Sequence, residues 1–319
     1  MKVFRNLLVV ALVLCAIIIL KAHQALNTPN GMNSSISVVV AKGDTSRHVA
    51  KKLEQAGVIK SRLLFQIAAR IYRIDKHLKA GEYLFSPNVS MSQVLVIVSK
   101  GRVYYRKIIL KEGWTTHRML EEIKKNENLT GEISVLISEG DLLPETYSFS
   151  RGDSRDSIII HAKSAMKKVL KDAWAHNQHS IIKSKEELLI LASIIEKETS
   201  VPDERADIAA VFINRLHKKM RLQTDPTVIY AITKGKEHFG RIVYRKDLKI
   251  DSPYNTYKIY GLPPGPICNP SKEAIWAAAN PSDVDYIYFV ASGRGGHLFA
   301  KTLSEHNNNV VIYRKNRQK

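Results

Sequence analysis

Two glutamates in the middle of the chain are the strongest candidates for proton-transfer chemistry. Glu196 and Glu198 follow a nearly unbroken apolar run, and residues two apart on a helix point about 200° away from each other. We therefore expect one carboxyl group to face the interior or a cleft and the other to face solvent. Ala192 and Ile195 flank Glu196, so Glu196 is predicted to be the partly desolvated one.

A partly buried carboxyl group suits acid–base chemistry on sugars. Burial raises the pKa of a carboxyl group and keeps its proton on near neutral pH. A protonated carboxyl group can then donate to a glycosidic oxygen as a general acid. The competing interpretation is an ion pair, because carboxylates at helix ends commonly pair with Lys or Arg. The spacing of the residues leaves both interpretations open.

Polar residues downstream could contact a saccharide. Gln223 and Thr224 precede Asp225, which is predicted to be the N-cap of a short helix, with a second catalytic carboxylate as the alternative. Tyr254 and Asn255 open a loop rich in proline and glycine. Tyrosine rings stack on pyranose rings and amides bond hydroxyls, so this loop suits sugar binding. A rigid structural turn is the alternative, and both can hold.

Two weaker patterns predict no site. Residues 293–297, GRGGH, follow a predicted strand over 286–290 and could cradle a phosphate, but they lack the spacing of phosphate-binding loops. A turn is therefore predicted there. His176 and His179 have no further metal-ligating residues near them in the sequence. We expect neither a metal nor a cofactor.

The helix that positions the two glutamates has a clear start. Ser184 with Glu187 three residues later is a capping-box pattern. The residues from Leu188 to Ile195 are apolar on nearly every side of the predicted helix. Because a helix that is hydrophobic all round is a buried one, this segment predicts the centre of a domain core.

The amino terminus predicts export from the cytoplasm. Residues 7–20 are an unbroken apolar run preceded by Lys2 and Arg5, and positive charge before such a run places the amino terminus in the cytoplasm. Lys21 can reach the headgroups while apolar residues extend the segment to residue 26. We expect a cytoplasmic tail over 1–6 and a retained transmembrane anchor over 7–26. A cleaved signal sequence is the competing interpretation.

The net charge limits the classes of binding partner, and the cysteine positions bear on whether a disulfide bond forms. The net charge of +19 attracts anionic polymers or anionic lipids. Because the chain is predicted to be exported, a cell-wall polymer and the membrane surface are favoured over nucleic acid. The two cysteines are Cys15, inside the apolar run, and Cys268. We expect no disulfide bond between them.

The rest of the chain predicts an α+β protein with two domains. Residues 27–36 are polar and form a linker, and residues 37–103 form a small α+β module. Within that module we expect strands near 36–40 and 80–85 and helices near 46–55, 61–71 and 92–99. Residues 104–319 form a larger mixed α+β domain that carries the candidate catalytic residues.

Several motifs together resemble one family. They are EGDLLPETY (139–147), ASIIEKET (192–199), VFINR (211–215), RLQTDPTVIY (221–230), YNTY (254–257) and GLPPGPI (261–267). In order and spacing they resemble the YceG-like (MltG) endolytic murein transglycosylases over nearly the whole chain. The motifs Lys42-Gly43-Asp44 and Ala80-Gly81-Glu82-Tyr83 look like that family's LysM-like domain.

The resemblance implies a function. It predicts a single-pass protein of the inner (cytoplasmic) membrane whose extracytoplasmic domain cleaves nascent peptidoglycan strands internally, near peptidoglycan synthases (penicillin-binding proteins). The family's catalytic glutamate falls on Glu196. Substrate-contacting or supporting roles are predicted for Gln223, Thr224, Asp225, Tyr254 and Asn255.

The expected reaction breaks the MurNAc–GlcNAc bond and closes a 1,6-anhydro ring on MurNAc. One carboxyl group suffices for this route, because the attacking hydroxyl belongs to the same sugar, whereas hydrolases use two carboxylates. A muramidase that uses water and a non-catalytic, membrane-anchored wall-binding scaffold are the alternatives.

Overall fold

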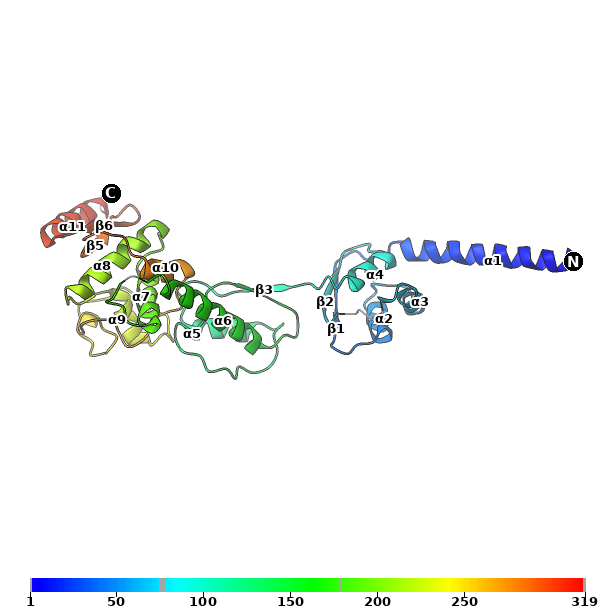
Figure 1. Cartoon of the computed structure of the whole chain (residues 1–319), viewed down its shortest axis with the longest axis horizontal. Coiled ribbons are helices and arrows are strands. Elements are labelled where there is room, and N and C mark those ends of the chain that lie inside the picture. Colours follow the sequence, from blue (N-terminus) through cyan, green and yellow to red (C-terminus); the bar gives the residue numbers. More distant parts are fainter. Residues whose placement is uncertain (1, 75–78, 178, 318–319) are drawn as a thin grey trace. The chain divides into compact units, whose positions relative to one another are not determined.

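The computed structural model describes residues 2–74, 79–177 and 179–317, and internal contacts divide the chain into two compact units (Figure 1). Unit 1 holds Met1–Arg106 with Ser148–Gly152, and unit 2 holds Lys107–Tyr147 with Asp153–Lys319. Strands β3 (Arg106–Ile109) and β4 (Thr146–Phe149) pair with each other, and the chain passes between the units within them. The fold is mixed α+β, as predicted.

The first helix, α1 (Lys2–Asn27), is long and apolar enough to span a membrane. The most apolar part of its segment Phe4–Asn27 is not buried by the rest of the chain. Such a surface is stable only in an apolar surrounding, which a bilayer supplies. The helix therefore fits a single-pass membrane anchor.

Unit 1 contains a small α+β module. Strand β1 (Ile36–Val40) pairs antiparallel with β2 (Gly81–Phe85), so that Val38 lies opposite Tyr83. The helices are α2 (Ser46–Gln55), α3 (Arg62–Ile71) and α4 (Met91–Ser99). Each helix begins after a residue whose hydroxyl accepts a backbone N–H of the first turn. These residues are Thr45 for α2, Ser61 for α3 and Ser90 for α4. The predicted order of strands and helices is confirmed.

Unit 2 is mostly helical, with one hairpin near its C-terminal end. Its helices are α5 (Thr116–Lys125), α6 (Arg155–Trp174), α7 (Lys185–Glu198), α8 (Arg205–His217), α9 (Asp225–Thr233), α10 (Lys272–Ala279) and α11 (Leu303–Arg317). Short 3-10 turns, η2 (Pro202–Glu204) and η3 (Asp247–Lys249), precede α8 and follow α9. The strands β5 (Tyr288–Ala291) and β6 (His297–Ala300) form the antiparallel hairpin.

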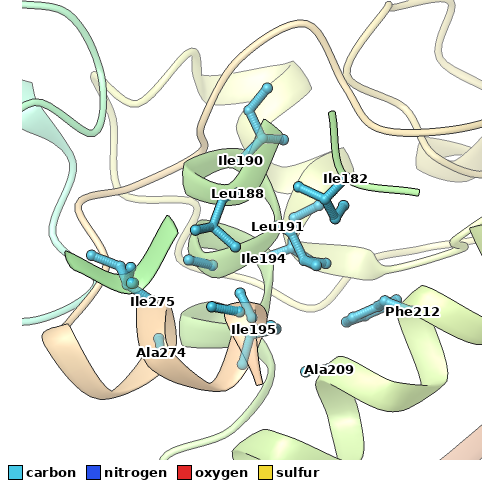
Figure 2. Close-up of a cluster of buried hydrophobic side chains, with 14 of the residues drawn as sticks. Ile182, Leu188, Ile190, Leu191, Ile194, Ile195, Ala209, Phe212, Ala274 and Ile275 are labelled. Carbon is cyan, nitrogen blue, oxygen red and sulfur yellow. The ribbon is translucent and has the colours of Figure 1, made fainter. Parts of the chain in front are cut away.

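Helix α7 runs through the hydrophobic core of unit 2 (Figure 2). Leu188, Leu191 and Ile195 are fully buried, and α6, α8 and α10 pack around the helix. The prediction of a buried helix is thus confirmed. Ser184 is its N-cap and accepts the Glu187 N–H at 3.2 Å, but the Glu187 carboxylate accepts from another backbone N–H, that of Lys183, at 2.7 Å.

Two local predictions at helix and strand ends have different outcomes. The predicted turn at 293–297 is confirmed, because it joins β5 to β6 and the Ser292 N–H donates to the Gly296 carbonyl at 2.8 Å. The prediction that Asp225 is an N-cap is wrong. Thr224 holds the N-cap position and Asp225 is the first residue of α9. The Thr224 hydroxyl makes no capping bond, since it donates to Glu198 instead.

Candidate active site

The two glutamates at the end of α7 have different neighbours. Glu196 approaches Gly113 and the start of α10, whereas Glu198 approaches the start of α9. Both side chains are half-buried. The prediction that one of them faces solvent is therefore wrong, because elements from separate parts of the chain cover both sides of the helix end.

Glu196 is engaged by the beginning of α10. Its Oε2 accepts the Ser271 N–H at 3.0 Å and the Ser271 hydroxyl at 2.5 Å. Ser271 is also the N-cap of α10, where its Oγ accepts the Ala274 N–H at 3.1 Å. One carboxylate oxygen of Glu196 is thus held by two internal donors, and the side chain fastens α7 to α10.

Glu198 has the surroundings expected of a general acid. It is the last residue of α7, where the helix carbonyls disfavour a negative charge. Burial raises the pKa of Glu198, the charge of Asp225 acts in the same direction, and the hydrogen bond from Thr224 opposes both. The positive charge of Arg215 also opposes the rise, as does His297 when it is protonated. Burial is therefore the largest influence on the pKa of Glu198.

Three of the predicted site residues lie together beside Glu198. Thr224 is buried; its hydroxyl contacts the carboxyl group, and its N–H donates to Thr256 Oγ1 at 3.1 Å. Asp225 is exposed and accepts the Tyr257 hydroxyl at 2.7 Å. Gln223 is exposed and has a positive φ of 51°. The strained backbone at this position directs the chain into α9.

Tyr254 and Asn255 lie elsewhere in the loop and differ in their contacts. The Tyr254 ring packs against Tyr230, with 4.8 Å between the centroids. Asn255 is completely buried, and its amide donates to the carbonyls of Leu248 and Ile250 at 3.0 and 2.7 Å. Its Oδ1 accepts the Tyr257 backbone N–H at 3.0 Å. Asn255 therefore holds the loop in shape and has no polar atom left for a saccharide.

A cleft of about 640 Å³ lies beside the end of α7. Its walls come from residues 112–125, from one side of α9 and from residues 235–239. Trp114, Tyr230 and Phe239 contribute aromatic rings, and the Arg118 guanidinium lies 4.4 Å from the Trp114 ring centroid. In the described part of the chain, neither Glu196 nor Glu198 belongs to the lining, but Lys197 between them does.

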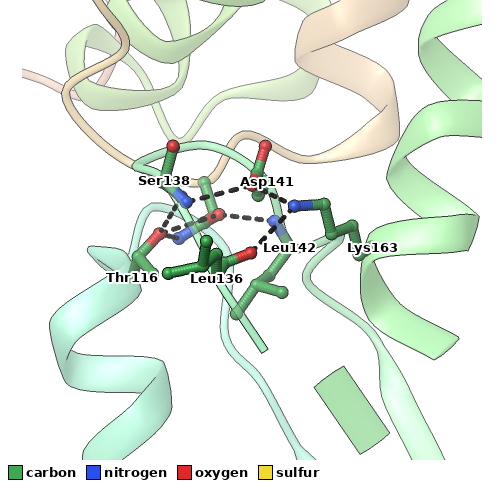
Figure 3. A network of polar contacts seen from close by, with 7 residues as sticks. Thr116, Leu136, Ser138, Asp141, Leu142 and Lys163 are labelled. Atoms are coloured by element: carbon green, nitrogen blue, oxygen red, sulfur yellow. Dashed lines mark hydrogen bonds and ion pairs between the residues drawn. The ribbon is translucent and has the colours of Figure 1, made fainter. Parts of the chain in front are cut away.

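A buried asparagine shapes one wall of this cleft. The Asn269 amide donates to the Trp114 carbonyl at 3.0 Å, and its Oδ1 accepts the Leu142 N–H at 2.9 Å. The same polar network contains an ion pair of 2.8 Å between Lys163 and Asp141 (Figure 3). Sequence spacing could not indicate this role, because Asn269 and Trp114 are 155 residues apart.

The arrangement combines a half-buried carboxyl group, whose pKa is raised by burial, with polar and aromatic surfaces. Glu198 can give and take a proton, Thr224 can orient its carboxyl group, and the Tyr257–Asp225 pair lies next to it. Tyr257 and Arg215 fall inside the sequence motifs but received no role from them. Their proximity to Glu198 depends on how α8, α9 and the 254–257 loop pack.

Comparisons with known proteins agree on one family. The sequence model of the YceG-like family matches residues 38–311. The endolytic murein transglycosylase of Bacillus subtilis (strain 168) is 32% identical over 310 residues, covering 86% of this chain and 83% of the relative. The endolytic murein transglycosylase of Streptococcus pneumoniae (strain D39) is 30% identical, covering 86% of this chain and 58% of the relative.

A solved structure is similar as well. The crystal structure of a YceG-like protein from Listeria monocytogenes aligns with a TM-score of 0.54 and 32% identity, covering 86% of this chain and 98% of that one. The sequence matches and this structural match extend over both units rather than over a single motif. The chain belongs to the YceG-like family.

Proposed function

We propose that this protein is a lytic transglycosylase that cleaves peptidoglycan glycan strands internally. The names of the relatives from B. subtilis and S. pneumoniae support this activity, at 32% and 30% identity over 86% of the chain. The observation that carries the mechanism is the desolvated Glu198 carboxyl group at the end of α7.

Glu198, rather than Glu196, is proposed as the acid and base. The sequence favoured Glu196 because it was expected to be the more desolvated residue and because the resemblance placed the family's catalytic glutamate there. In the folded chain, burial raises the pKa of Glu198, so this carboxyl group keeps its proton closer to neutral pH. Glu196 is held by both donors of Ser271 and has a clear structural task at the start of α10.

The proposed reaction needs one carboxyl group and no water. Glu198 donates its proton to the oxygen between MurNAc C1 and GlcNAc C4, and the C1–O bond breaks with positive charge developing on MurNAc C1. The MurNAc 6-hydroxyl then bonds to C1 and returns its proton to Glu198, which closes a 1,6-anhydro ring. Because the attacking hydroxyl is held within the same sugar, its effective concentration is high.

Neighbouring residues receive supporting roles in this proposal. Thr224 orients the Glu198 carboxyl group through its hydroxyl, and the exposed side chains of Gln223 and Asp225 are available to sugar hydroxyls. The glycan strand continues along the cleft that carries Trp114 and Tyr230, against which Tyr254 packs. Aromatic faces at such positions suit the apolar faces of pyranose rings.

The location follows from the anchor. Helix α1 spans the cytoplasmic membrane once, and Lys2 and Arg5 keep the amino terminus in the cytoplasm. The small module over 37–103 is proposed to be LysM-like, and the domain over 104–319 is proposed to be catalytic. Both then lie outside the cytoplasm, where nascent strands and the synthases that make them are the expected partners.

Paired variants test the proposal. Full-length wild type, Glu198→Gln and Glu196→Gln are incubated with purified uncrosslinked glycan strands, and the products are analysed by mass spectrometry. The wild type should yield 1,6-anhydro-MurNAc ends. Glu198→Gln should slow cleavage about 10²- to 10⁴-fold, and Glu196→Gln should stay within about tenfold because Gln can still accept from Ser271. Glu186→Gln, an exposed change in the first turn of the same helix, is the control.

Each other outcome has a distinct meaning. Loss of activity in Glu196→Gln with retention in Glu198→Gln would return the acid–base role to Glu196. Products without anhydro ends would identify a muramidase that uses water. Binding to strands without cleavage by the wild type would indicate the wall-binding scaffold.

A further inference from the structure

Glu204 lies in an enclosed polar junction next to the proposed acid. It ends the short turn η2, and both of its carboxylate oxygens are engaged. Oε1 accepts the His297 N–H at 2.7 Å, and Oε2 lies 2.8 Å from His297 Nδ1. Oε2 also accepts the Thr199 hydroxyl at 3.3 Å. Only 17% of the Glu204 side chain and 16% of the His297 side chain are exposed.

The β5–β6 turn leaves room for this carboxylate. Gly296 has a φ of +74°, and a Cβ atom at this position would collide with Glu204 Oε1. Glycine suits the left-handed backbone here, and a side chain would displace the Glu204 carboxylate from its present position. The GRGGH segment therefore has a specific structural purpose: it delivers the backbone N–H and the imidazole of His297 to Glu204.

The junction connects directly to Glu198. Thr199, which donates to Glu204, is the residue after Glu198 and the C-cap of α7. The imidazole of His297 is fixed on a second side by Phe289, whose ring meets it edge-on at 5.3 Å. When protonated, His297 is close enough to lower the pKa of Glu198. The junction thus fixes both the position of the acid and one of the charges around it.

We propose that Glu204 and His297 form a positioning pair for Glu198, holding the end of α7 in place and keeping a chargeable imidazole beside the reacting carboxyl group. This inference rests on the proposed function, because it assigns the pair a task in the same reaction. Neither residue needs to touch the glycan. Glu204 orients His297 through Nδ1, and Thr199 transmits the position of Glu204 to the helix end.

The other groups around Glu198 explain why a cation is useful there. Asp225 of α9 adds negative charge and Arg215 of α8 adds positive charge. His297 of β6 adds positive charge when it is protonated, and Thr224 supplies the hydrogen bond. Arg215 is itself nearly buried and bonds the Leu222 and Ile287 carbonyls, so its place is fixed. While the 6-hydroxyl attacks, Glu198 is ionised, and a nearby positive charge stabilises that state.

The test compares His297→Gln, Glu204→Gln and the double variant in the full-length protein. Cleavage of glycan strands should show kcat lowered about 10- to 100-fold with KM within about twofold, since misplacing a reacting group affects the chemical step. The double variant should be no slower than the slower single variant, because the pair acts as one unit. His161→Gln on α6, an exposed histidine, is the matched control.

Two readouts separate positioning from a merely structural role. In His297→Gln the alkaline limb of the pH–kcat profile should move to higher pH, because a positive neighbour of Glu198 is gone. Carboxyl ¹³C NMR titration should show the same upward change in the pKa of Glu198, and it does not depend on activity. Circular dichroism checks folding. Thr199→Val is a milder change in the same junction and should also lower kcat.

The inference would be overturned if the folded variants kept the kcat, the pH profile and the Glu198 titration of the wild type. That result would leave the proposed function intact. Independent losses that multiply in the double variant would also overturn it. An inactive wild type would refute the proposed function, whereas the NMR titration would still decide whether His297 acts on Glu198.

Discussion

At the residue scale, Glu139 shows how burying a carboxyl group makes the stability of the native state depend on pH. Its Oε1 accepts the Thr116 N–H at 2.7 Å and its Oε2 accepts the Tyr230 hydroxyl at 3.3 Å. Despite these donors, burial raises the pKa of Glu139 above its ordinary value of 4.5. A carboxyl group whose pKa is raised by folding stabilises the native state at low pH, and this contribution is lost as pH rises through the raised pKa.

Glu139→Gln should remove that pH dependence. The amide keeps the acceptor for Thr116 and carries no charge to bury, so the variant should match the wild type near pH 4 and be more stable at pH 7. All three tryptophans, Trp114, Trp174 and Trp276, lie in unit 2. Urea unfolding followed by their fluorescence therefore measures the stability of the unit that contains Glu139. An equal or lower stability of the variant at pH 7 would contradict the expectation.

At the scale of elements, one ion pair joins β2 to the start of β3 within unit 1. Glu82 is completely buried, and the Arg106 guanidinium donates to both of its oxygens at 2.8 Å. The hydrogen bonds from Arg106 hold the pKa of Glu82 below its ordinary value of 4.5, against the effect of burial. This contribution to stability is complete above the unfolded pKa and is lost as pH falls through the lower native one.

Arg106→Ala should therefore destabilise unit 1 by about 3–5 kcal/mol at neutral pH, since it leaves a buried charge without its partner. Far-UV circular dichroism should show an earlier urea transition, while tryptophan fluorescence, which reports unit 2, should stay near the wild-type midpoint. Arg102→Ala, an exposed arginine nearby, should change stability by less than about 0.5 kcal/mol. Equal effects of the two substitutions would refute a special role for the pair.

At the scale of the whole molecule, α1 is the basis of the proposed location of the chemistry. The helix exposes an apolar surface over Phe4–Asn27 that fits a bilayer, and basic residues precede it. The rest of unit 1 and all of unit 2 are therefore expected on the extracytoplasmic side. Neither native cysteine should react with a water-soluble thiol reagent, because Cys15 lies within the span and Cys268 is buried.

Membrane-impermeant maleimide labelling of intact cells should reveal this topology. Ser34→Cys, exposed after the span, should be labelled from outside. Asn6→Cys, exposed before it, should be labelled only after permeabilisation. Labelling of Asn6→Cys in intact cells would reverse the orientation, and loss of the residue 6 label with cleavage of the chain would support a removed signal sequence.

The sequence by itself determined the local features and the family. Hydroxyl caps, apolar periodicity and turn glycines act between residues close in the chain, so the helices after Thr45 and Ser184 and the turn before His297 were predictable. The apolar amino-terminal run predicted a helix able to span a membrane for the same reason. The ordered motifs identified the YceG-like family, which the comparisons confirm.

Only the tertiary structure decided which glutamate lies in the drier place. Helical geometry put Glu196 and Glu198 on opposite sides of α7, but the environment of each side comes from distant segments. The start of α10 engages Glu196, while α9 and the β5–β6 turn surround Glu198. Desolvation depends on every atom packed around a group, and spacing along one helix contains no information about those atoms.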